Sequence, residues 1–214
     1  VPVIEKVQGL ASALAEAHAQ GRIHYDDAVV EQSEDVEAIR HRCDRQQDKE
    51  AFYAAYAAAG FDYGTTFRAV DVIRFNRNEA LVDLSLPPAV AEEPLLLHPS
   101  LMDGALQSLS CLLDSSDGVY LPFALDELRI ATDQLPTRCY AHAQASDGEG
   151  AVRRFDIRIL APSGEVLVAF KGFAARRIAR TEAPEADDPL LDLLRRLADG
   201  ELSAEEVEQL LPLL

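Results

Sequence analysis

Tryptophan is absent from the 214-residue sequence, methionine occurs once, and aromatic residues make up only 7% of the chain. The core must therefore be built mainly from Leu, Val, Ile and Ala, and a chain of this length suits one domain, or a small domain with an appendage. No stretch approaches the roughly 18 apolar residues of a membrane span, and no segment resembles a signal peptide. We expect no membrane partner.

Basic residues are scarce: 20 Lys and Arg stand against 37 Asp and Glu, for a formal net charge of −17. Nucleic-acid binding requires clustered Lys and Arg, so this balance argues against a nucleic-acid partner. Cysteines are also few, and Cys43, Cys111 and Cys139 are far apart and odd in number. We expect no disulfide framework, no metal site and a reducing, cytoplasmic setting, with the three thiols acting as small apolar side chains.

The acidic excess is concentrated at the C-terminal end, where residues 181–214 hold ten Asp and Glu but two Arg. Residues 181–189 carry prolines and acids and are predicted to form a linker. Residues 190–214 have leucines at helical spacing and predict two short amphipathic helices, the first ending at Gly200. Such a helical tail can fold back on the main domain or dock onto a partner protein, and we favour docking because a linker precedes it.

The main body changes periodicity along the chain. Residues 36–59 are rich in alanine and predict a helix closed by Gly60, whereas the segments from Tyr63 onward favour strands. One later segment, residues 100–113, predicts an apolar helix with Ser100 as its N-cap. An antiparallel sheet around one buried helix is an α+β layer architecture. The strands are predicted over residues 66–75, 79–86, 123–131, 137–145, 152–161 and 165–179.

Asp103 lies within the apolar helix, between Met102 and Leu106. Burial would raise the pKa of this carboxyl, so that it could stay protonated near neutral pH and donate a proton to a leaving hydroxyl. Gln107 lies one turn later on the same helix face and could orient the acid or a substrate oxygen. The alternative is an acidic residue placed near the helix N-terminus by the helix dipole, and the residue pattern alone favours that alternative.

Four segments in order along the chain resemble those of one known family. The sequence LHPSLMDGALQ (97–107) resembles HPxLxDxxLQ, the C-terminal active-site motif of polyketide synthase dehydratase domains. GFDYGTTF (60–67) resembles the family's GxxYGPxF, LPFALDELRI (121–130) its LPF strand, and VLVAFKGFAARRI (166–178) its closing strand. The resemblance covers about residues 45–178 and is greatest to modular bacterial synthases, those with trans-acting acyltransferases among them.

The resemblance implies a double-hotdog fold, of which this chain holds the second half. Residues 61–180 would form that C-terminal hotdog, with residues 26–60 as a linker and helix. Residues 1–25 would be a remnant of the first hotdog, with HAQGRI (18–23) as its last strand.

The resemblance also implies roles for single residues. Asp103 would protonate the β-hydroxyl during water elimination, and Gln107 would hydrogen-bond beside it. His98 is the motif histidine, for which we expect a structural hydrogen bond at the helix entrance. No cofactor is implied, because the substrate would ride on the phosphopantetheine arm of an acyl carrier protein. The residues predicted to line the substrate path are Tyr63, Phe67, His98, Leu121 and Pro122.

One expected residue is missing. The family's base is a histidine in an HxxxGxxxxP motif of the first hotdog, and no such motif follows any of the five histidines, His18, His24, His41, His98 and His142. The proline of YGPxF is also replaced, since Thr65-Thr66 precedes Phe67. Because an acid alone cannot complete the elimination, the chain by itself should not dehydrate a substrate.

Three hypotheses remain. The chain is a piece of an active dehydratase whose histidine half lies upstream or on another chain, which the retained Asp103 and Gln107 favour. Alternatively it is a non-eliminating module, such as a branching, structural or carrier-binding domain. A single hotdog pairing as a homodimer ranks last.

Expected partners are an acyl carrier protein and, through residues 190–214, neighbouring synthase domains. Carrier proteins are commonly acidic, so the bulk charge of this chain would not attract one. A local basic patch would be needed, for which the candidates are Arg153, Arg154, Arg176 and Arg177.

Overall fold

The computed structural model describes residues 20–25, 32–91, 95–113, 119–146 and 151–178. The chain divides into two units, Val1–Val30 and Glu31–Leu214. In the first unit, residues 20–25 form no strand, and Ile23 and Tyr25 are exposed. The strand predicted over residues 18–23 is therefore wrong for its described part, residues 20–23. The predicted linker and helical tail, residues 181–214, lie outside the described residues.

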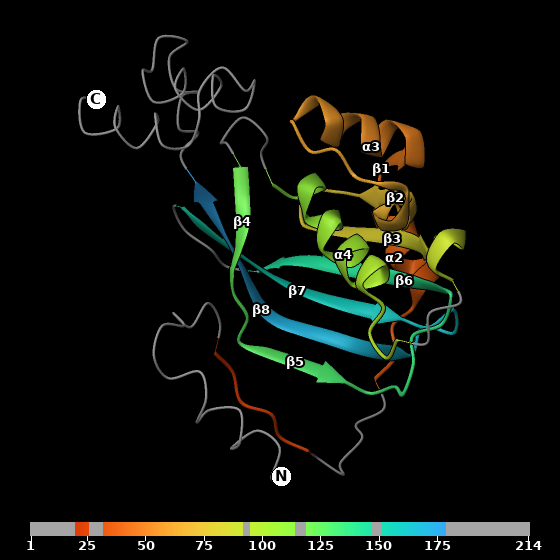
Figure 1. The fold of residues 1–214 in the computed structure, drawn as a ribbon, viewed down its shortest axis with the longest axis vertical. Helices are drawn as coiled ribbons and strands as arrows, with labels where there is room; N and C mark the ends of the chain where they lie inside the picture. The colour runs from red at the N-terminus through yellow and green to blue at the C-terminus, as the bar shows by residue number, and fades with distance from the viewer. Residues whose placement is uncertain (1–19, 26–31, 92–94, 114–118, 147–150, 179–214) are drawn as a thin grey trace, which may run out of the picture. The chain divides into compact units, whose positions relative to one another are not determined.

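The described residues of the second unit form one sheet of eight antiparallel strands (Figure 1). The strand order is β1-β2-β3-β6-β7-β8-β4, and β5 pairs with the first part of β8 while β4 pairs with its second part. The strands are β1 (Arg45–Asp48), β2 (Val70–Phe75), β3 (Glu79–Ser85), β4 (Val119–Ala124), β5 (Glu127–Ile130), β6 (Arg138–Ser146), β7 (Val152–Leu160) and β8 (Val166–Ile178).

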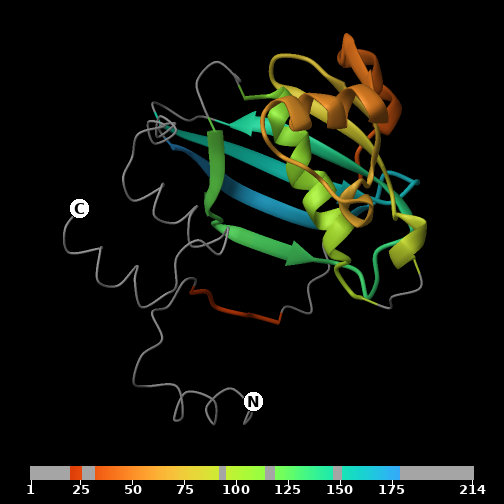
Figure 2. The same ribbon diagram turned by 45° about the horizontal axis from the view of Figure 1, so that its top comes forward.

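In the described ranges three α-helices accompany the sheet: α2 (Val36–Arg42), α3 (Lys49–Ala58) and α4 (Pro99–Gln107). Figures 1 and 2 show α4 lying across one face of the sheet, with α3 next to it. Short 3₁₀ turns cover Thr65–Phe67, Pro88–Val90 and Ser108–Cys111.

The core lies between α4 and the sheet. Leu101 and Ala105 of α4 are fully buried there, together with alternate residues of the central strands such as Val82 and Ile157. The predicted α+β architecture, an antiparallel sheet around a helix, is confirmed.

The helix predicted over residues 36–59 is two helices in the structure, separated by β1. Asp35 and Asp48 each accept a backbone hydrogen bond at 2.9 Å from the third residue ahead and so begin α2 and α3. Between them the backbone of β1 pairs with β2 at the edge of the sheet. The expected end at Gly60 is confirmed, since this glycine follows α3 with φ 91°, where a side chain would be strained.

The strand predicted over residues 123–131 is also two strands. Pro122 lies inside β4 rather than before it, which is tolerated because β4 is the edge strand of the sheet and the proline N need not donate. The partner strand β8 bends at Gly172 (φ 62°), and β4 and β5 pair on either side of this bend. The strands predicted over 137–145, 152–161 and 165–179 match β6, β7 and β8 to within one residue at each described end.

The three cysteines carry free thiols, and Cys139 is buried. Among the described residues there is no group of His, Cys, Asp and Glu that could hold a metal ion. None of the described helices is long and apolar enough to cross a membrane.

Candidate active site

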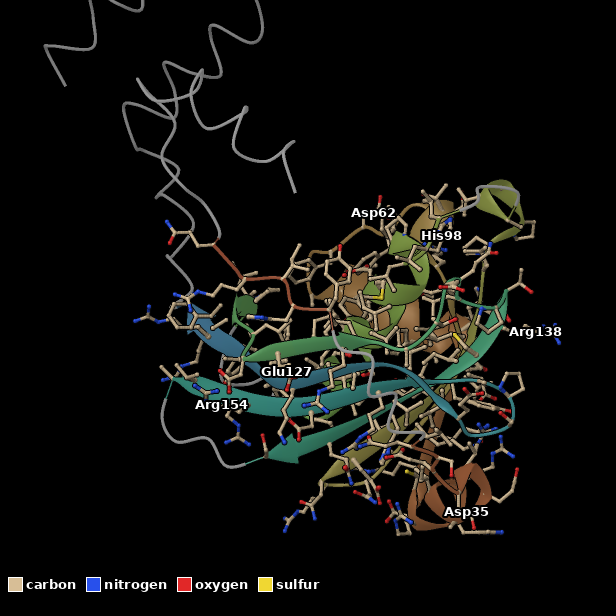
Figure 3. All side chains as sticks on the ribbon, turned by 90° about the horizontal axis from the view of Figure 1, so that it is seen from below. Asp35, Asp62, His98, Glu127, Arg138 and Arg154 are labelled. Atoms are coloured by element: carbon tan, nitrogen blue, oxygen red, sulfur yellow. The ribbon has the colours of Figure 1, made fainter. Side chains whose placement is uncertain are left out.

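The start of α4 is fixed by His98, which lies at the helix entrance (Figure 3). Its Nδ1 accepts a hydrogen bond from the backbone N–H of Ser100 at 3.2 Å, and Pro99 occupies the first helical position. The N-cap is therefore His98 and not Ser100 as predicted, because the Ser100 hydroxyl instead donates to the carbonyl of Thr66 at 2.6 Å. The structural hydrogen bond expected of His98 is confirmed, and its side chain is buried.

Asp103 and Gln107 meet on one face of α4. The Gln107 side-chain amide Nε2 donates to Asp103 Oδ2 at 2.7 Å, as the four-residue spacing predicts. Gln107 is buried and Asp103 is half-buried. Burial raises the pKa of Asp103, and the hydrogen bond from Gln107 offsets only part of this effect. This carboxyl therefore holds its proton to higher pH than an exposed aspartate.

Two tyrosines of α3 hold Gln107 from the opposite side. The Tyr53 hydroxyl donates to Gln107 Oε1 at 2.9 Å, and the Tyr56 hydroxyl donates to the Gln107 backbone carbonyl at 2.9 Å. The second N–H of the Gln107 amide reaches the carbonyl of Phe67 at 3.2 Å. Neither tyrosine was predicted from the sequence. Their three-residue spacing in an alanine-rich helix was the available signal, since it places both phenols on one helix face.

Tyr63 completes an aromatic group with these two tyrosines. Its ring centroid lies 6.0 Å from that of Tyr53 and 5.1 Å from that of Tyr56, both at steep interplanar angles. Burial, and then the charge of Asp103, raise the pKa of Tyr63, which places this phenol in the electrostatic neighbourhood of the carboxyl. Burial also raises the pKa of Tyr53 to about 12, so both phenols are neutral donors near pH 7.

Of the other residues predicted for the site, Phe67 lies at the edge of the hydrogen-bonded group around Gln107, and Leu121 and Pro122 lie apart from it. Phe67 contributes its backbone carbonyl, while its side chain is partly exposed. Leu121 and Pro122 lie on β4, where both are exposed. They belong to a strip of exposed apolar side chains along β4 and β5, which comprises Leu121, Phe123, Leu125, Leu128 and Ile130. Exposed apolar strips of this kind mark surfaces that contact another chain or domain.

The four candidate arginines gather where β7 begins and β8 ends, beside β4. Arg176 lies opposite Val152 of β7 and Leu121 of β4, and its guanidinium stands 5.0 Å from the ring centroid of Phe123. Arg154, labelled in Figure 3, pairs with Asp126 at 3.0 Å. Because neighbouring residues of a strand point to opposite faces of the sheet, Arg154 and Arg176 share one face and Arg153 and Arg177 share the other. The fold therefore brings the four arginines to one end of the sheet but divides them into two pairs.

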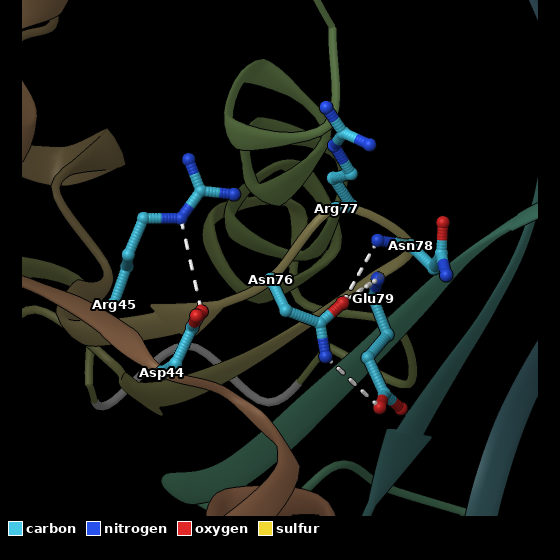
Figure 4. A pocket seen from close by; sticks show the side chains of 6 residues that line it. All are labelled: Asp44, Arg45, Asn76, Arg77, Asn78 and Glu79. Carbon is cyan, nitrogen blue, oxygen red and sulfur yellow. Dashed lines mark hydrogen bonds and ion pairs between the residues drawn. The ribbon is translucent and has the colours of Figure 1, made fainter.

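A polar hollow of about 500 Å³ lies at the turn between β2 and β3 (Figure 4). Its polar groups largely satisfy one another: Asn76 Oδ1 accepts from the backbone N–H groups of Asn78 and Glu79, at 2.8 and 3.0 Å. The hollow is open to solvent and is explained by turn formation. It is lined by Asp44, Arg45, Asn76, Arg77, Asn78 and Glu79.

An antiparallel sheet around a central helix that presents a hydrogen-bonded, half-buried acid defines a hotdog domain of the dehydratase class. A family model described as "Polyketide synthase dehydratase N-terminal domain" matches residues 31–185, and the chain belongs to this family of polyketide synthase dehydratase domains. The resemblance stated from the sequence motifs is thereby confirmed.

Known polyketide synthases and solved dehydratase domains are similar to this chain in sequence and in fold. Polyketide synthase PksN of Bacillus subtilis (strain 168) is 33% identical over 164 residues, which are 74% of this chain and 3% of PksN. A trans-AT polyketide synthase dehydratase domain from Brevibacillus brevis is 28% identical with a TM-score of 0.63, over 70% of this chain and 54% of that one. The dehydratase domain of the CurK module of curacin polyketide synthase is 25% identical with a TM-score of 0.60, over 67% and 52%. The chain spans about half the length of these solved domains.

Proposed function

We propose that this chain is the acid-bearing second hotdog of a dehydratase domain. The complete domain eliminates water from a β-hydroxyacyl thioester carried on the phosphopantetheine arm of an acyl carrier protein. The observation that carries this proposal is the half-buried Asp103 carboxyl, whose pKa is raised and whose Oδ2 is hydrogen-bonded by Gln107. A protonated carboxyl that is held in place is what a departing hydroxide needs.

In the proposed reaction a base removes the proton on the α-carbon, and the electron pair of that C–H bond forms the double bond to the β-carbon. The β-carbon–oxygen bond breaks, and Asp103 gives its proton to the departing oxygen. The products are water and an α,β-unsaturated thioester. Asp103 is left as a carboxylate, which the hydrogen bond from Gln107 stabilises until it is protonated again.

The base comes from outside the described residues in this proposal. His142 has both ring nitrogens on the carboxylates of Glu34 and Glu79, whereas His98 caps α4 through Nδ1 and its buried Nε2 has no hydrogen-bond partner. His24 and His41 are exposed, and no HxxxGxxxxP motif follows any of these four histidines, so we assign the base to none of them. Solved variants of the CurK dehydratase that replace one aspartate by asparagine or one histidine by phenylalanine are described as inactive. This supports a division of labour between Asp103 and a histidine of the first hotdog.

The test is to join the chain to the upstream half of its polypeptide and to assay water loss from a carrier-bound β-hydroxyacyl thioester by mass spectrometry. We expect Asp103→Asn to abolish the loss of 18 Da, a fall of about 100-fold or more for a general acid. Asp133→Asn, in an exposed turn, is the matched control and should retain full activity. Dehydration that persists in Asp103→Asn, or an upstream sequence without an HxxxGxxxxP motif, would sink the proposal.

The competing function is a dehydratase-like module that binds the carrier without eliminating water. It is favoured by Thr65-Thr66 in place of the family's proline, a segment that forms a 3₁₀ turn beside the site. Carrier binding without loss of water in the joined protein would favour this function. In both cases the proposed carrier surface lies at the end of the sheet that carries Arg153, Arg154, Arg176 and Arg177, two on each face, whose charge complements an acidic carrier.

A further inference from the structure

Tyr53 contacts Gln107 at its side-chain amide oxygen. The tyrosine is buried, and its oxygen accepts a hydrogen bond from the backbone N–H of Val70 at 3.1 Å. Its own proton has two acceptors within reach, Gln107 Oε1 at 2.9 Å and the carbonyl of Phe67 at 3.3 Å. A hydroxyl has one proton to give, and the shorter contact directs it to the amide oxygen.

The orientation of the Gln107 amide decides whether a hydrogen-bond donor or an acceptor faces the Asp103 carboxyl. The two ends of a glutamine amide have nearly the same shape, but one end donates and the other accepts. With its oxygen held by Tyr53, the amide turns its NH₂ end toward Asp103 Oδ2 and the Phe67 carbonyl. The flipped amide would set its oxygen against both of these acceptors.

We propose that the Tyr53 hydroxyl is a positioning group for the acid: by fixing the Gln107 amide oxygen, it keeps the NH₂ end on Asp103 Oδ2. Tyr53 does not touch the reacting atoms and acts through Gln107. The catalytic meaning of this inference rests on the proposed function. With Oδ2 occupied by the amide, the acidic proton is carried by Oδ1, the oxygen left to face a substrate hydroxyl.

The test is a titration of Asp103 in the full 214-residue chain, followed by NMR of ¹³C-labelled aspartate and assigned by the signal lost in Asp103→Asn. We expect Tyr53→Phe to move the midpoint of Asp103 upward by about half to one pH unit, the equivalent of one weakened hydrogen bond. Tyr56→Phe is the matched control. It removes a phenol that binds the backbone carbonyl of Gln107 rather than its amide, and it should leave the midpoint in place.

A double-mutant cycle separates positioning from a general loss of packing. Gln107→Leu should raise the midpoint of Asp103 at least as much as Tyr53→Phe does. Adding Tyr53→Phe to Gln107→Leu should then produce no further shift, because the tyrosine acts only through the amide. Additive shifts in the double mutant, or a wild-type midpoint in Tyr53→Phe, would overturn the proposal.

A measurement on the wild-type chain covers the case in which Tyr53→Phe does not fold. If the NH₂ end faces the carboxyl, the side-chain amide proton signals of Gln107 should shift with the same midpoint as Asp103. Amide signals that stay constant through this titration would overturn the proposal. None of these readouts uses substrate, so they hold or fail independently of whether the complete domain eliminates water.

Discussion

Gly104 sets the distance between α4 and the sheet. A Cβ atom at this position would lie 2.9 Å from Leu84 Cδ2 and 3.2 Å from the Cβ of Ala69, which is closer than packed carbon atoms approach. The glycine sits next to Asp103, so the close approach that it permits also places the acid beside the tyrosines of α3.

We expect Gly104→Ala to lower the free energy of unfolding by about 1–3 kcal/mol through overpacking, although alanine is the better helix former. Gly64→Ala is the control, because Gly64 has an ordinary φ of −64° and no atom within 4 Å of its Cβ position. Urea unfolding of both variants checks this. If Gly104→Ala and Gly64→Ala had the same free energy of unfolding, the prediction would be wrong and α4 could move away from the sheet at little cost.

Part of the site could be predicted from residue spacing alone. Asp103 and Gln107 are four residues apart on one helix, so their contact follows from helix geometry. Tyr53 lies 54 residues before Gln107, and no local rule predicts that their side chains meet. The cap at His98 was missed for a similar reason, since the hydroxyl of Ser100 found a partner in another segment, Thr66.

A network of charged and polar side chains around the buried His142 joins α2 and its preceding segment to the sheet. His142 of β6 is fully buried, with Nδ1 2.6 Å from Glu34 Oε2 and Nε2 3.0 Å from Glu79 Oε2. Arg42 of α2 donates twice to Glu79, at 2.7 and 2.9 Å, and Arg158 of β7 pairs with Glu34 at 3.0 Å. Removing one member of such a network leaves its partners buried and unpaired.

This network predicts how stability depends on pH. Hydrogen bonds from Arg42, opposed in part by burial, lower the pKa of Glu79 to about 2. A carboxyl with a lowered pKa contributes its full stabilisation above its unfolded-state pKa, and loses it as the pH falls toward the folded-state value. The free energy of unfolding should therefore fall between about pH 4.5 and pH 2.

Glu79→Gln should lower stability at pH 7 and flatten that acid-side fall, as measured by urea unfolding across the pH range. Glu127→Gln is the control, because Glu127 lies exposed on β5 and pairs only with the neighbouring surface Arg129 among the contacts described. Glu127→Gln should keep the wild-type fall of the free energy of unfolding with falling pH. A Glu79→Gln profile parallel to the wild type would refute a role for this carboxyl.

Within the part of the chain that the structure describes, the edge of the sheet formed by β4 and β5 carries exposed apolar side chains. The exposed apolar strip on β4 and β5 includes Phe123, whose side chain is 59% exposed. The chain spans about half of the solved dehydratase domains that it resembles. In the proposed complete domain the first hotdog is the occupant of this strip.

We expect Phe123→Asp to leave the stability of the isolated chain within about 0.5 kcal/mol, because the side chain is mostly solvent-exposed. The same change should weaken association with a separately produced upstream half by 10-fold or more, the effect of losing about 1.4 kcal/mol at an interface. Analytical ultracentrifugation of the mixed halves checks this. Arg77→Asp, on the turn between β2 and β3, is the control and should bind the upstream half as the wild type does. If Phe123→Asp and Arg77→Asp bound it equally well, the apolar strip would not be the interface.

Chain-local patterns determined the central strands, the apolar helix with its acid, and the family, because periodicity, turn residues and motif spacing act over a few residues. Tertiary structure alone decided where the long predicted segments divide, since β1 and the bend in β8 depend on neighbouring strands. It also decided which groups hold Gln107 and which carboxylates flank His142. Buried hydrogen-bond donors and acceptors pair with whatever the packed fold brings within about 3 Å, and that choice is made across the chain rather than along it.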